Sequence, residues 1–338
     1  MNWKIHAISQ LDLLQDDWRR LNLQGNGSPL LALEFMRPLL QAFGTGRELI
    51  ACLHHENCIT AMLILTRRGS GSWTTFQPAQ APLGACVHAT ADWPDCLTSL
   101  MPRLPGMALV LGVTQQDPDL QPRPSERAAL TTLDYIKTAK ISLSGNFEIY
   151  WNARGKNLRQ NMKKQRARLE KEGVTTRLQI TTAPEEMALA VADYGRLESS
   201  GWKGEKGSAV HADNAQGMFY RSMLEAFCGE GRARVFRYWY DARLVAMDLC
   251  IEGDDHIVIL KTTYDESIGN ATSPALLMRQ EAFAGLFAEP RLQRIEFFGK
   301  IMDWHTRWSD ESRTMYHLNL YRWPALGLFR KLLRKLKN

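Results

Sequence analysis

Side chains able to move protons gather at the end of one apolar run. In the stretch HIVILKTTYDE, Lys261 interrupts the run, and Tyr264, Asp265 and Glu266 follow it. Asp265 could bind or deprotonate a nucleophile, Tyr264 could donate a proton to a leaving group, and Lys261 could pair with a carboxylate such as Asp265 in a polar cleft. Each residue also has a structural alternative. Asp265 could be a turn residue that caps the next helix, Tyr264 could be a packed ring, and Lys261 could be solvated on a half-buried strand.

A second group of candidates stands earlier in the chain, in ESSGWKGEKG. Glu198, near the end of a helix pattern, could be the general base or an exposed helical glutamate. Trp202 and Lys203 lie between two glycines, which indicates a mobile loop that contacts a substrate. Trp202 suits stacking on a sugar ring or an adenine, and its alternative is a hydrophobic plug over the core.

Other chemistries lack their motifs. Among the eight histidines, His54 and His55 form the one close pair, and there is no H-E-x-x-H, so we expect no metal. There is no G-x-S-x-G, and GTGRE at 44–48 lacks the lysine and the length of a phosphate-binding P-loop. The six cysteines show no C-x-x-C and no zinc spacing, so we expect reduced, mostly structural thiols.

Length and composition bound the elements that must position these residues. The chain has 338 residues, 45% hydrophobic and 23% charged, which describes a globular protein of roughly two domains. No apolar run approaches the ~18 residues of a membrane-spanning helix. The N-terminal stretch has acids where a signal peptide needs an apolar core. We therefore expect the chain to start here and to stay in the cytoplasm.

The two halves show the same order of elements. Each reads as helices, an antiparallel meander of three strands, a helix and a further strand, which indicates α/β (α+β) architecture and two copies of one fold. In the first half the helices are expected at 11–24, 28–44 and 94–104, and the strands at 48–55, 59–68, 71–78 and 107–113. In the second half the helices are expected at 154–173, 184–201, 214–231 and 273–288, and the strands at 175–182, 232–241, 244–253, 256–265, 292–299 and 313–323.

Positive charge is concentrated in two segments. The net charge is +6, yet residues 154–173 alone hold eight Lys/Arg against two Glu, and residues 321–338 hold six Lys/Arg and no acid. The first segment could grip phosphates or could be a solvated linker helix. In the second, apolar residues recur with helical spacing from Phe329 to Leu336, which is typical of a helix lying on an anionic membrane, or of one docked on the body.

The second half resembles the CelD-like acetyltransferase family, associated with bacterial cellulose and exopolysaccharide biosynthesis. That family belongs to the GNAT superfamily, and its members look like tandem GNAT folds related to the FemAB aminoacyl transferases. The resemblance covers about residues 146–310. It is carried by Glu198, Gly201, Trp202, Lys203, Gly204, Lys261, Tyr264, Asp265, Glu266, Ser273, Pro274 and the stretch from Trp304 to Trp308. His305 stands where the family tends to have a lysine.

This resemblance implies a tandem GNAT fold with two mixed sheets flanked by helices. The expected parts are a degenerate GNAT-like domain at 1–145, an acyltransferase domain at 146–322 and a basic helix at 323–338. The implied activity is transfer of an acetyl or longer acyl group from acyl-CoA to an amine or hydroxyl, such as that of a polysaccharide or lipid-linked sugar precursor. Acyl-CoA is the expected donor, and no metal is expected.

The resemblance also implies roles for particular residues. The catalytic group would comprise Asp265, Lys261, Tyr264 and Glu198, and the substrate-binding group Trp202, Lys203 and His305. The pyrophosphate of the donor would lie on the small residues before the next helix, Gly269, Asn270, Ala271, Thr272 and Ser273. These lack the usual Q/R-x-x-G-x-G/A pattern, and Pro274 offers no N–H, so the cradle is degenerate.

Two other functions fit the same residues. A FemAB-type transferase would use aminoacyl-tRNA, the less favoured partner, and its 154–173 helix would contact the RNA. A GNAT-derived scaffold of an exopolysaccharide assembly would have no catalysis. If the protein is the acyl-CoA-dependent transferase, the helix at 323–338 would hold it at the inner membrane as a peripheral protein.

Overall fold

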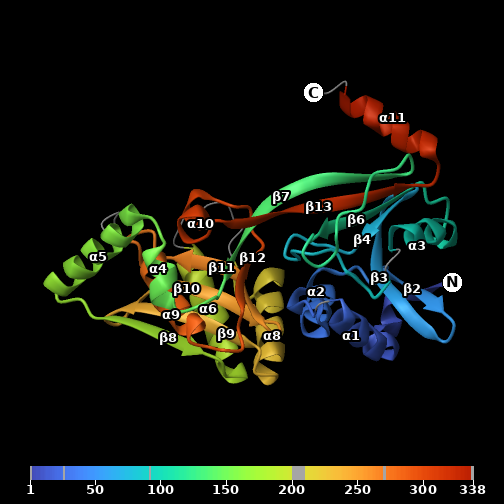
Figure 1. Cartoon of the computed structure of the whole chain (residues 1–338). Helices are drawn as coiled ribbons and strands as arrows, with labels where there is room; N and C mark the ends of the chain where they lie inside the picture. The colour runs from blue at the N-terminus through green and yellow to red at the C-terminus, as the bar shows by residue number, and fades with distance from the viewer. Residues whose placement is uncertain (1, 26, 91–92, 200–209, 269–271, 336–338) are drawn as a thin grey trace. The chain divides into compact units, whose positions relative to one another are not determined.

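The computed structural model describes residues 2–25, 27–90, 93–199, 210–268 and 272–335 (Figure 1). Two compact units are present, Met1–Lys137 with Arg313–Asn338, and Thr138–Ser312. Across the described ranges, no helix has the length and apolar character needed to cross a membrane. The domain boundaries expected at 145/146 and 322/323 remain a prediction.

In the described residues of the first unit, strands β1 to β6 and helices α1 to α3 precede the long strand β7. Its elements are β1 (Asn2–Ala7), α1 (Gln15–Gln24), α2 (Leu33–Phe43), β2 (Leu49–His55), β3 (Cys58–Gly69), β4 (Ser72–Thr75), β5 (Cys86–His88), α3 (Trp93–Leu100), β6 (Val110–Gln116), β7 (Leu130–Ser142), β13 (Glu311–Tyr321) and α11 (Pro324–Lys335). β7 ends and β13 begins in the second unit.

The second unit carries the residues of chemical interest. Its elements are α4 (Phe147–Asn152), α5 (Lys156–Lys171), β8 (Thr176–Thr181), α6 (Met187–Ser199), α8 (Ala215–Gly229), β9 (Ala233–Tyr240), β10 (Arg243–Glu252), β11 (His256–Tyr264), α9 (Pro274–Phe287), β12 (Arg294–Phe297) and α10 (Asp303–Trp308). Asn214 caps α8, because its side chain accepts a hydrogen bond from the backbone N–H of Gly217.

The described strands join one sheet, not two. Thirteen strands form a mixed sheet in the order β1-β2-β3-β4-β6-β13-β7-β12-β11-β10-β9-β8, with β5 paired to β3 off this path. The expectation of two mixed sheets is therefore wrong. Its physical reason is that β7 and β13 are neighbours in this order, so the edges that would have ended two separate sheets are hydrogen-bonded.

In the first unit the sheet is buried on both faces. Along β2, Ala51 and Leu53 pack with Trp93 and Leu97 of α3 in one cluster. The alternate residue Ile50 is equally buried, and α1 packs against β3 and β5. Alternation of side chains across a strand thus feeds two apolar layers, which explains why these strands read as nearly continuous apolar runs.

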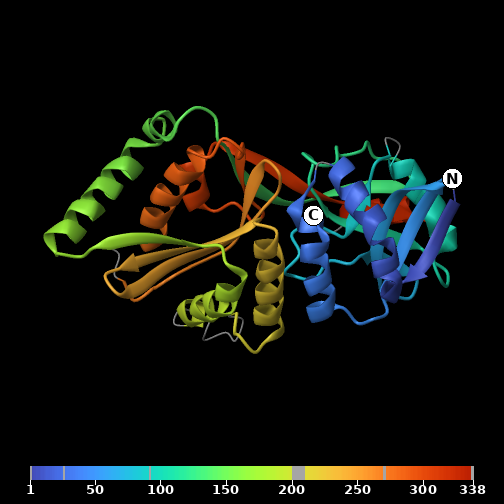
Figure 2. The ribbon, with the colours of Figure 1, turned by 90° about the horizontal axis from the view of Figure 1, so that it is seen from below.

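In the second unit helices also cover both faces. Figure 2 shows α9 and α5 on one side of strands β8–β11, and α6 and α8 on the other. Leu158, Met162 and Leu169 anchor α5 in the apolar cluster that includes Leu277 and Phe283 of α9. The apolar stripe noted in residues 154–173 therefore docks α5 on the body, while its polar side chains stay outside.

Most expected elements are confirmed, and the structure adds others. The helix expected at 154–173 is α5, and the helix expected at 184–201 begins with a 3-10 turn and becomes α6. The elements that were not expected are β1, β5, β7, α4 and α10. All six cysteines are free and all but Cys58 are buried.

Candidate active site

The sheet opens where β11 and β12 part. These strands run parallel and are joined by α9, and their pairing extends from His256 opposite Arg294 to Ile259 opposite Phe297. β12 ends there, whereas β11 continues to Tyr264 along β10. Beyond Ile259, β11 therefore no longer pairs with β12 on that side, and a cavity lies at this point.

This β11 cavity has a volume of about 770 Å³. Such a volume is typical of small-molecule sites. Its walls come from the end of β11, the turn after it, the start of α9 and one side chain of α10. The lining residues are Thr262, Tyr264, Glu266, Ile268, Thr272, Ser273, Pro274, Ala275, Leu276, Arg279 and Trp304.

A β-bulge decides which side chains of β11 reach this cavity. Opposite β10, Leu249 pairs with Lys261 and Cys250 with Ile259, so Leu260 is an extra residue. Before the bulge, Ile259 packs in the cluster beneath α9. After it, Thr262 and Tyr264 line the cavity. The extra residue reverses the alternation and turns Lys261 to the opposite face, towards α6 and α8.

A buried ion pair forms the floor of the β11 cavity. Arg279 of α9 and Asp248 of β10 are 3% and 1% exposed, and Arg279 Nε lies 3.9 Å from Asp248 Oδ2. Arg279 Nη2 donates to Thr262 Oγ1 at 2.8 Å. Burial raises the pKa of the Asp248 carboxyl, and the charge of Arg279 opposes that rise. The pair fixes a cation directly under the cavity.

Trp304 and His305 complete this wall. The guanidinium carbon of Arg279 lies 4.0 Å from the centroid of the Trp304 ring, a cation–π contact. His305 stacks on Trp304 and accepts a hydrogen bond at Nδ1 from the backbone N–H of Met302 at 2.9 Å. Burial, together with the charge of Arg279, lowers the pKa of His305 to about 4. A neutral, buried His305 therefore supports Trp304 and does not supply the positive charge of the lysine that it replaces.

On the opposite face of β11, Glu198 and Lys261 form a second polar pair. Glu198, in the last turn of α6, is 4% exposed, and its Oε1 lies 3.9 Å from Lys261 Nζ. Its Oε2 accepts the backbone N–H of Val210 at 2.7 Å. Lys261 Nζ lies 5.6 Å from the centroid of the Tyr220 ring. The alternative of an exposed helical glutamate is wrong, because this carboxylate is enclosed by α6, α8 and β11.

Tyr194 links this pair to the strand that lines the cavity. Its hydroxyl donates to the carbonyl of Thr262 at 3.0 Å and lies 3.5 Å from Glu198 Oε1. Burial, with the neighbouring Glu198 charge, raises the pKa of Tyr194 well above its usual value, so the phenol stays protonated and remains a donor.

Asp265 lies in a turn and is fully engaged there. Its Oδ1 accepts the N–H and hydroxyl of Ser267 at 3.0 and 2.7 Å, and its Oδ2 accepts Arg243 Nε at 2.9 Å. These bonds hold the pKa of the Asp265 carboxyl below its usual value, against the opposing effect of burial. The partner suggested for Lys261 was Asp265, but the structure places Glu198 there. This geometry favours the turn-residue alternative.

The structure thus groups some expected residues and separates others. Tyr264, Thr272 and Ser273 line the β11 cavity, Glu198 and Lys261 meet on the far face of β11, and Asp265 stays in its turn. The remaining expected site residues lie outside the described residues: Gly269, Asn270, Ala271, Trp202 and Lys203. Among the residues that are described, no group of three or more His, Cys, Asp or Glu is placed to hold a metal ion.

Asp248 and Arg279 were not identified as site residues from the sequence, although each of them interrupts an apolar run. Asp248 interrupts the apolar run VAMDLC, and Arg279 interrupts SPALLMRQEAF. A charge inside an apolar run is seldom buried without a partner. Two such interruptions in one unit predict a buried pair, and nothing in their spacing says that the pair lies under a cavity.

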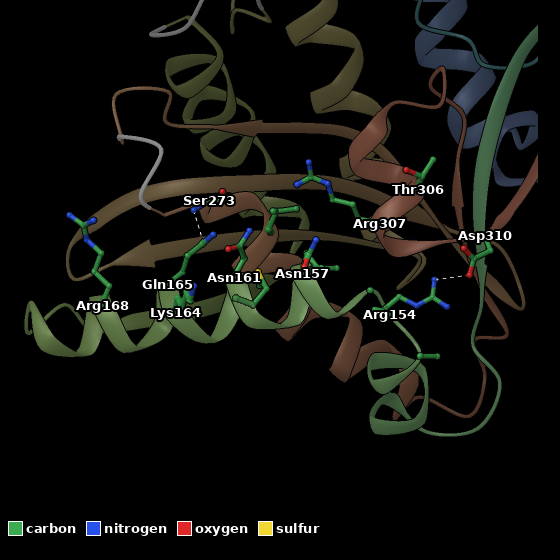
Figure 3. A pocket seen from close by; sticks show the side chains of 15 residues that line it. Arg154, Asn157, Asn161, Lys164, Gln165, Arg168, Ser273, Thr306, Arg307 and Asp310 are labelled. Carbon is green, nitrogen blue, oxygen red and sulfur yellow. Dashed lines mark hydrogen bonds and ion pairs between the residues drawn. The ribbon is translucent and has the colours of Figure 1, made fainter.

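A second cavity, the α5 groove, lies between α5, the start of α9 and α10. Its volume is about 920 Å³. In Figure 3, polar side chains that recur along one face of α5 border the groove, and Thr306 and Arg307 of α10 lie across from them. The residues labelled there are Arg154, Asn157, Asn161, Lys164, Gln165, Arg168, Ser273, Thr306, Arg307 and Asp310.

Part of the second unit matches a known protein family. Residues 156–306, from the first residue of α5 into α10, match the family model described as acetyltransferase (GNAT) domain. This segment is similar to a GNAT acetyltransferase domain. The resemblance to the CelD-like GNAT family is confirmed for these residues. No protein of curated function matches the chain in sequence.

Solved structures extend the likeness of the fold to the whole chain. FemX has a TM-score of 0.58 at 8% identity and covers 97% of this chain and 99% of its own. A conserved protein of unknown function from Bacteroides thetaiotaomicron has a TM-score of 0.56 at 8% identity, with 95% and 99% covered. The C-terminal domain (DUF2156) of a putative lysylphosphatidylglycerol synthetase from Agrobacterium fabrum has a TM-score of 0.54 at 13% identity, with 94% and 95% covered. The chain has a mixed α/β, GNAT-like fold.

Proposed function

We propose that this protein transfers an acyl group from acyl-CoA to an amine or hydroxyl acceptor, in the second unit. The observation that carries the proposal is the parting of β11 from β12, with the β11 cavity at that point. An extended donor with amide groups can add to a free strand edge by main-chain hydrogen bonds. The pantetheine arm of CoA has this chemistry, and its thioester would lie at the end of β11.

The two faces of β11 suggest separate roles. The cavity beneath α9 would take the donor, and the acceptor would approach from the side of α6 and α8. Glu198 would accept the proton of the attacking amine or hydroxyl, while the ammonium of Lys261 at 3.9 Å balances its charge. The attacking atom bonds to the thioester carbon, the C–S bond breaks, and Tyr264 returns a proton to the leaving thiolate.

The acceptor class is the finer part of the proposal. The CelD-like resemblance favours an amino sugar or another precursor of a polysaccharide. The start of α11 and the residue before it support work beside a membrane, because Trp323, Leu328 and Phe329 are 48%, 53% and 62% exposed. We expect the wild-type protein to sediment with vesicles of anionic phospholipid and a variant ending at residue 322 to stay in solution. Equal sedimentation of both would refute a membrane role for the helix.

Calorimetric titration tests the donor first. Wild-type protein is titrated with acetyl-CoA and a longer acyl-CoA, with desulfo-CoA as a control for the part without the sulfur. Micromolar binding of either thioester is the expected result. A folded sample that binds neither up to millimolar concentration would refute the CoA-dependent function.

Glu198→Gln tests the base. We expect turnover with a panel of amino sugars, followed as release of CoA thiol, to fall about 10²- to 10⁴-fold while acetyl-CoA binding is unchanged. The matched control is Glu186→Gln, which alters an exposed glutamate just before the same helix. Asp265→Asn is measured beside them. A larger loss in Asp265→Asn than in Glu198→Gln would move the base to Asp265 and contradict the proposal.

A further inference from the structure

We propose that the α5 groove binds the 3′-phosphate at the nucleotide end of the acyl-CoA donor. This inference rests on the proposed function, since it assigns a second part of the same ligand. The groove lies along α5, which comes before β8 in the chain, and its positive charge has no role in the site at the parting of β11 and β12.

The groove carries an excess of positive charge. Arg154, Lys164, Arg168 and Arg307 line it, against one acid, Asp310. Asp310 lies 3.2 Å from Arg154 and so balances that arginine. Arg168 Nε contacts Glu172 at 2.7 Å, an exposed pair of little strength. Between described residues, no ion pair within 4.0 Å involves Lys164 or Arg307, so two cations are available to a ligand.

Within the described residues, the start of α9 offers few backbone N–H groups that could bind a phosphate in place of these side chains. The backbone N–H of Ser273 donates to Gln165 Oε1 at 2.8 Å, so this donor is occupied by α5 itself. Pro274 has no N–H. A phosphate near the first described residues of α9 therefore finds few backbone donors. Side chains of α5 and α10 are the remaining source of positive charge.

The groove is a neighbour of the β11 cavity. Ser273 and Leu276 line both, so a ligand whose thioester occupies one would reach the other by extending past the start of α9. Acyl-CoA has this length and polarity, because it joins an apolar thioester arm to a pyrophosphate and a 3′-phosphomonoester. A phosphomonoester carries a charge of about −1.5 to −2 at pH 7, which suits two cations on opposite walls.

The groove is held in shape by contacts between α5 and α9. Arg166 Nη1 contacts Glu281 at 2.9 Å, and Arg166 Nε donates to Gln280 at 3.1 Å. Leu158 and Met162 are buried beside them. The helices that frame the groove are therefore fixed before a ligand binds, so binding would order mainly the exposed side chains that meet the phosphate.

The experiment compares acetyl-CoA with acetyl-dephospho-CoA, which lacks the 3′-phosphate. Calorimetry is run on the wild type, on the double variant Lys164→Gln/Arg307→Gln, and on Lys163→Gln. Lys163 is the matched control, because it is the neighbouring exposed lysine of α5 and does not line the groove. Lys164 and Arg307 are exposed, so the double variant should fold, and its melting temperature checks this.

We expect the wild type to bind acetyl-CoA about tenfold more tightly than the dephospho analogue. The double variant should bind both with the same, weaker affinity, and Lys163→Gln should behave as wild type. A double variant that keeps the full preference for acetyl-CoA would overturn the inference and leave the proposed function standing.

Failure of the proposed function gives a different pattern. If the wild type binds neither thioester, the function fails and this assignment fails with it. Aminoacyl-tRNA is then titrated into the wild type and the double variant. Binding that is weakened by Lys164→Gln/Arg307→Gln would make RNA the occupant of the groove and would also overturn the inference.

Discussion

Removing Arg279 should damage the protein in a way that depends on pH. The variant Arg279→Met keeps the length of the side chain but leaves Asp248, 1% exposed, without its counter-charge. Breaking a buried ion pair at one partner costs about 3–5 kcal/mol. The hydrogen bond to Thr262 Oγ1 and the contact with the Trp304 ring are lost with it. At pH 7 we expect a loss of unfolding free energy of about that size.

The loss should shrink in acid. Burial raises the pKa of Asp248, so in the variant the folded state binds a proton more readily than the unfolded chain does. Stability lost at pH 7 therefore returns as the pH falls and the carboxyl becomes neutral. The double variant Asp248→Asn/Arg279→Met removes the unpaired charge and should regain part of the loss at pH 7.

Urea unfolding followed by tryptophan fluorescence measures these changes, with each variant studied at pH 5 and pH 7. Acetyl-CoA titration of the same samples reports on the cavity above the pair. A loss below about 1 kcal/mol in Arg279→Met at pH 7, or a double variant less stable than the single one, would refute the reasoning.

Other predictions concern α6, α9 and α10. A Cβ on Gly195 would lie 2.6 Å from the carbonyl oxygen of Val210, whereas one on Gly285 meets nothing within 4 Å. Gly195→Ala should thus lower the melting temperature, and Gly285→Ala should add about 0.5–1 kcal/mol; equal losses would contradict the packing. Burial and Arg279 lower the pKa of His305 from 6.5 to about 4, so the unfolded chain binds its proton more readily and stability should fall as the pH drops between these values. His305→Gln should reduce that fall, and an NMR titration of His305 with a midpoint near 6.5 would contradict it.

Periodicity was a sound guide to the elements and a poor one to their pairing. α5 follows an apolar stripe at helical spacing, and α9, β9, β10 and β11 follow apolar runs, so local pattern sufficed for them. Strand partners far apart in sequence leave no local mark. The adjacency of β7 and β13, which makes the sheet continuous, could not be read from either strand alone.

The sequence predicted several residues of the candidate site but gave Lys261 the wrong ion-pair partner. Glu198 and Lys261 were both named, but Asp265 was suggested as the partner of Lys261 because it is close in sequence. The turn to Ser267 and the contact with Arg243 draw Asp265 away. Such choices depend on which atoms compete for one carboxylate, and no single residue encodes that competition.

The bulge at Leu260 reverses the alternation of β11 side chains between the two faces of the sheet, and the proposed chemistry depends on this reversal. If Leu260 were paired in regular alternation, the ammonium of Lys261 would lie beside Arg279 in the β11 cavity and Thr262 would turn towards Glu198. Deleting Leu260, by contrast, would straighten the strand and leave both side chains on their present faces. An alignment that places no gap here against a related chain without the bulge would therefore assign the residues on one side of it to the wrong half of the reaction.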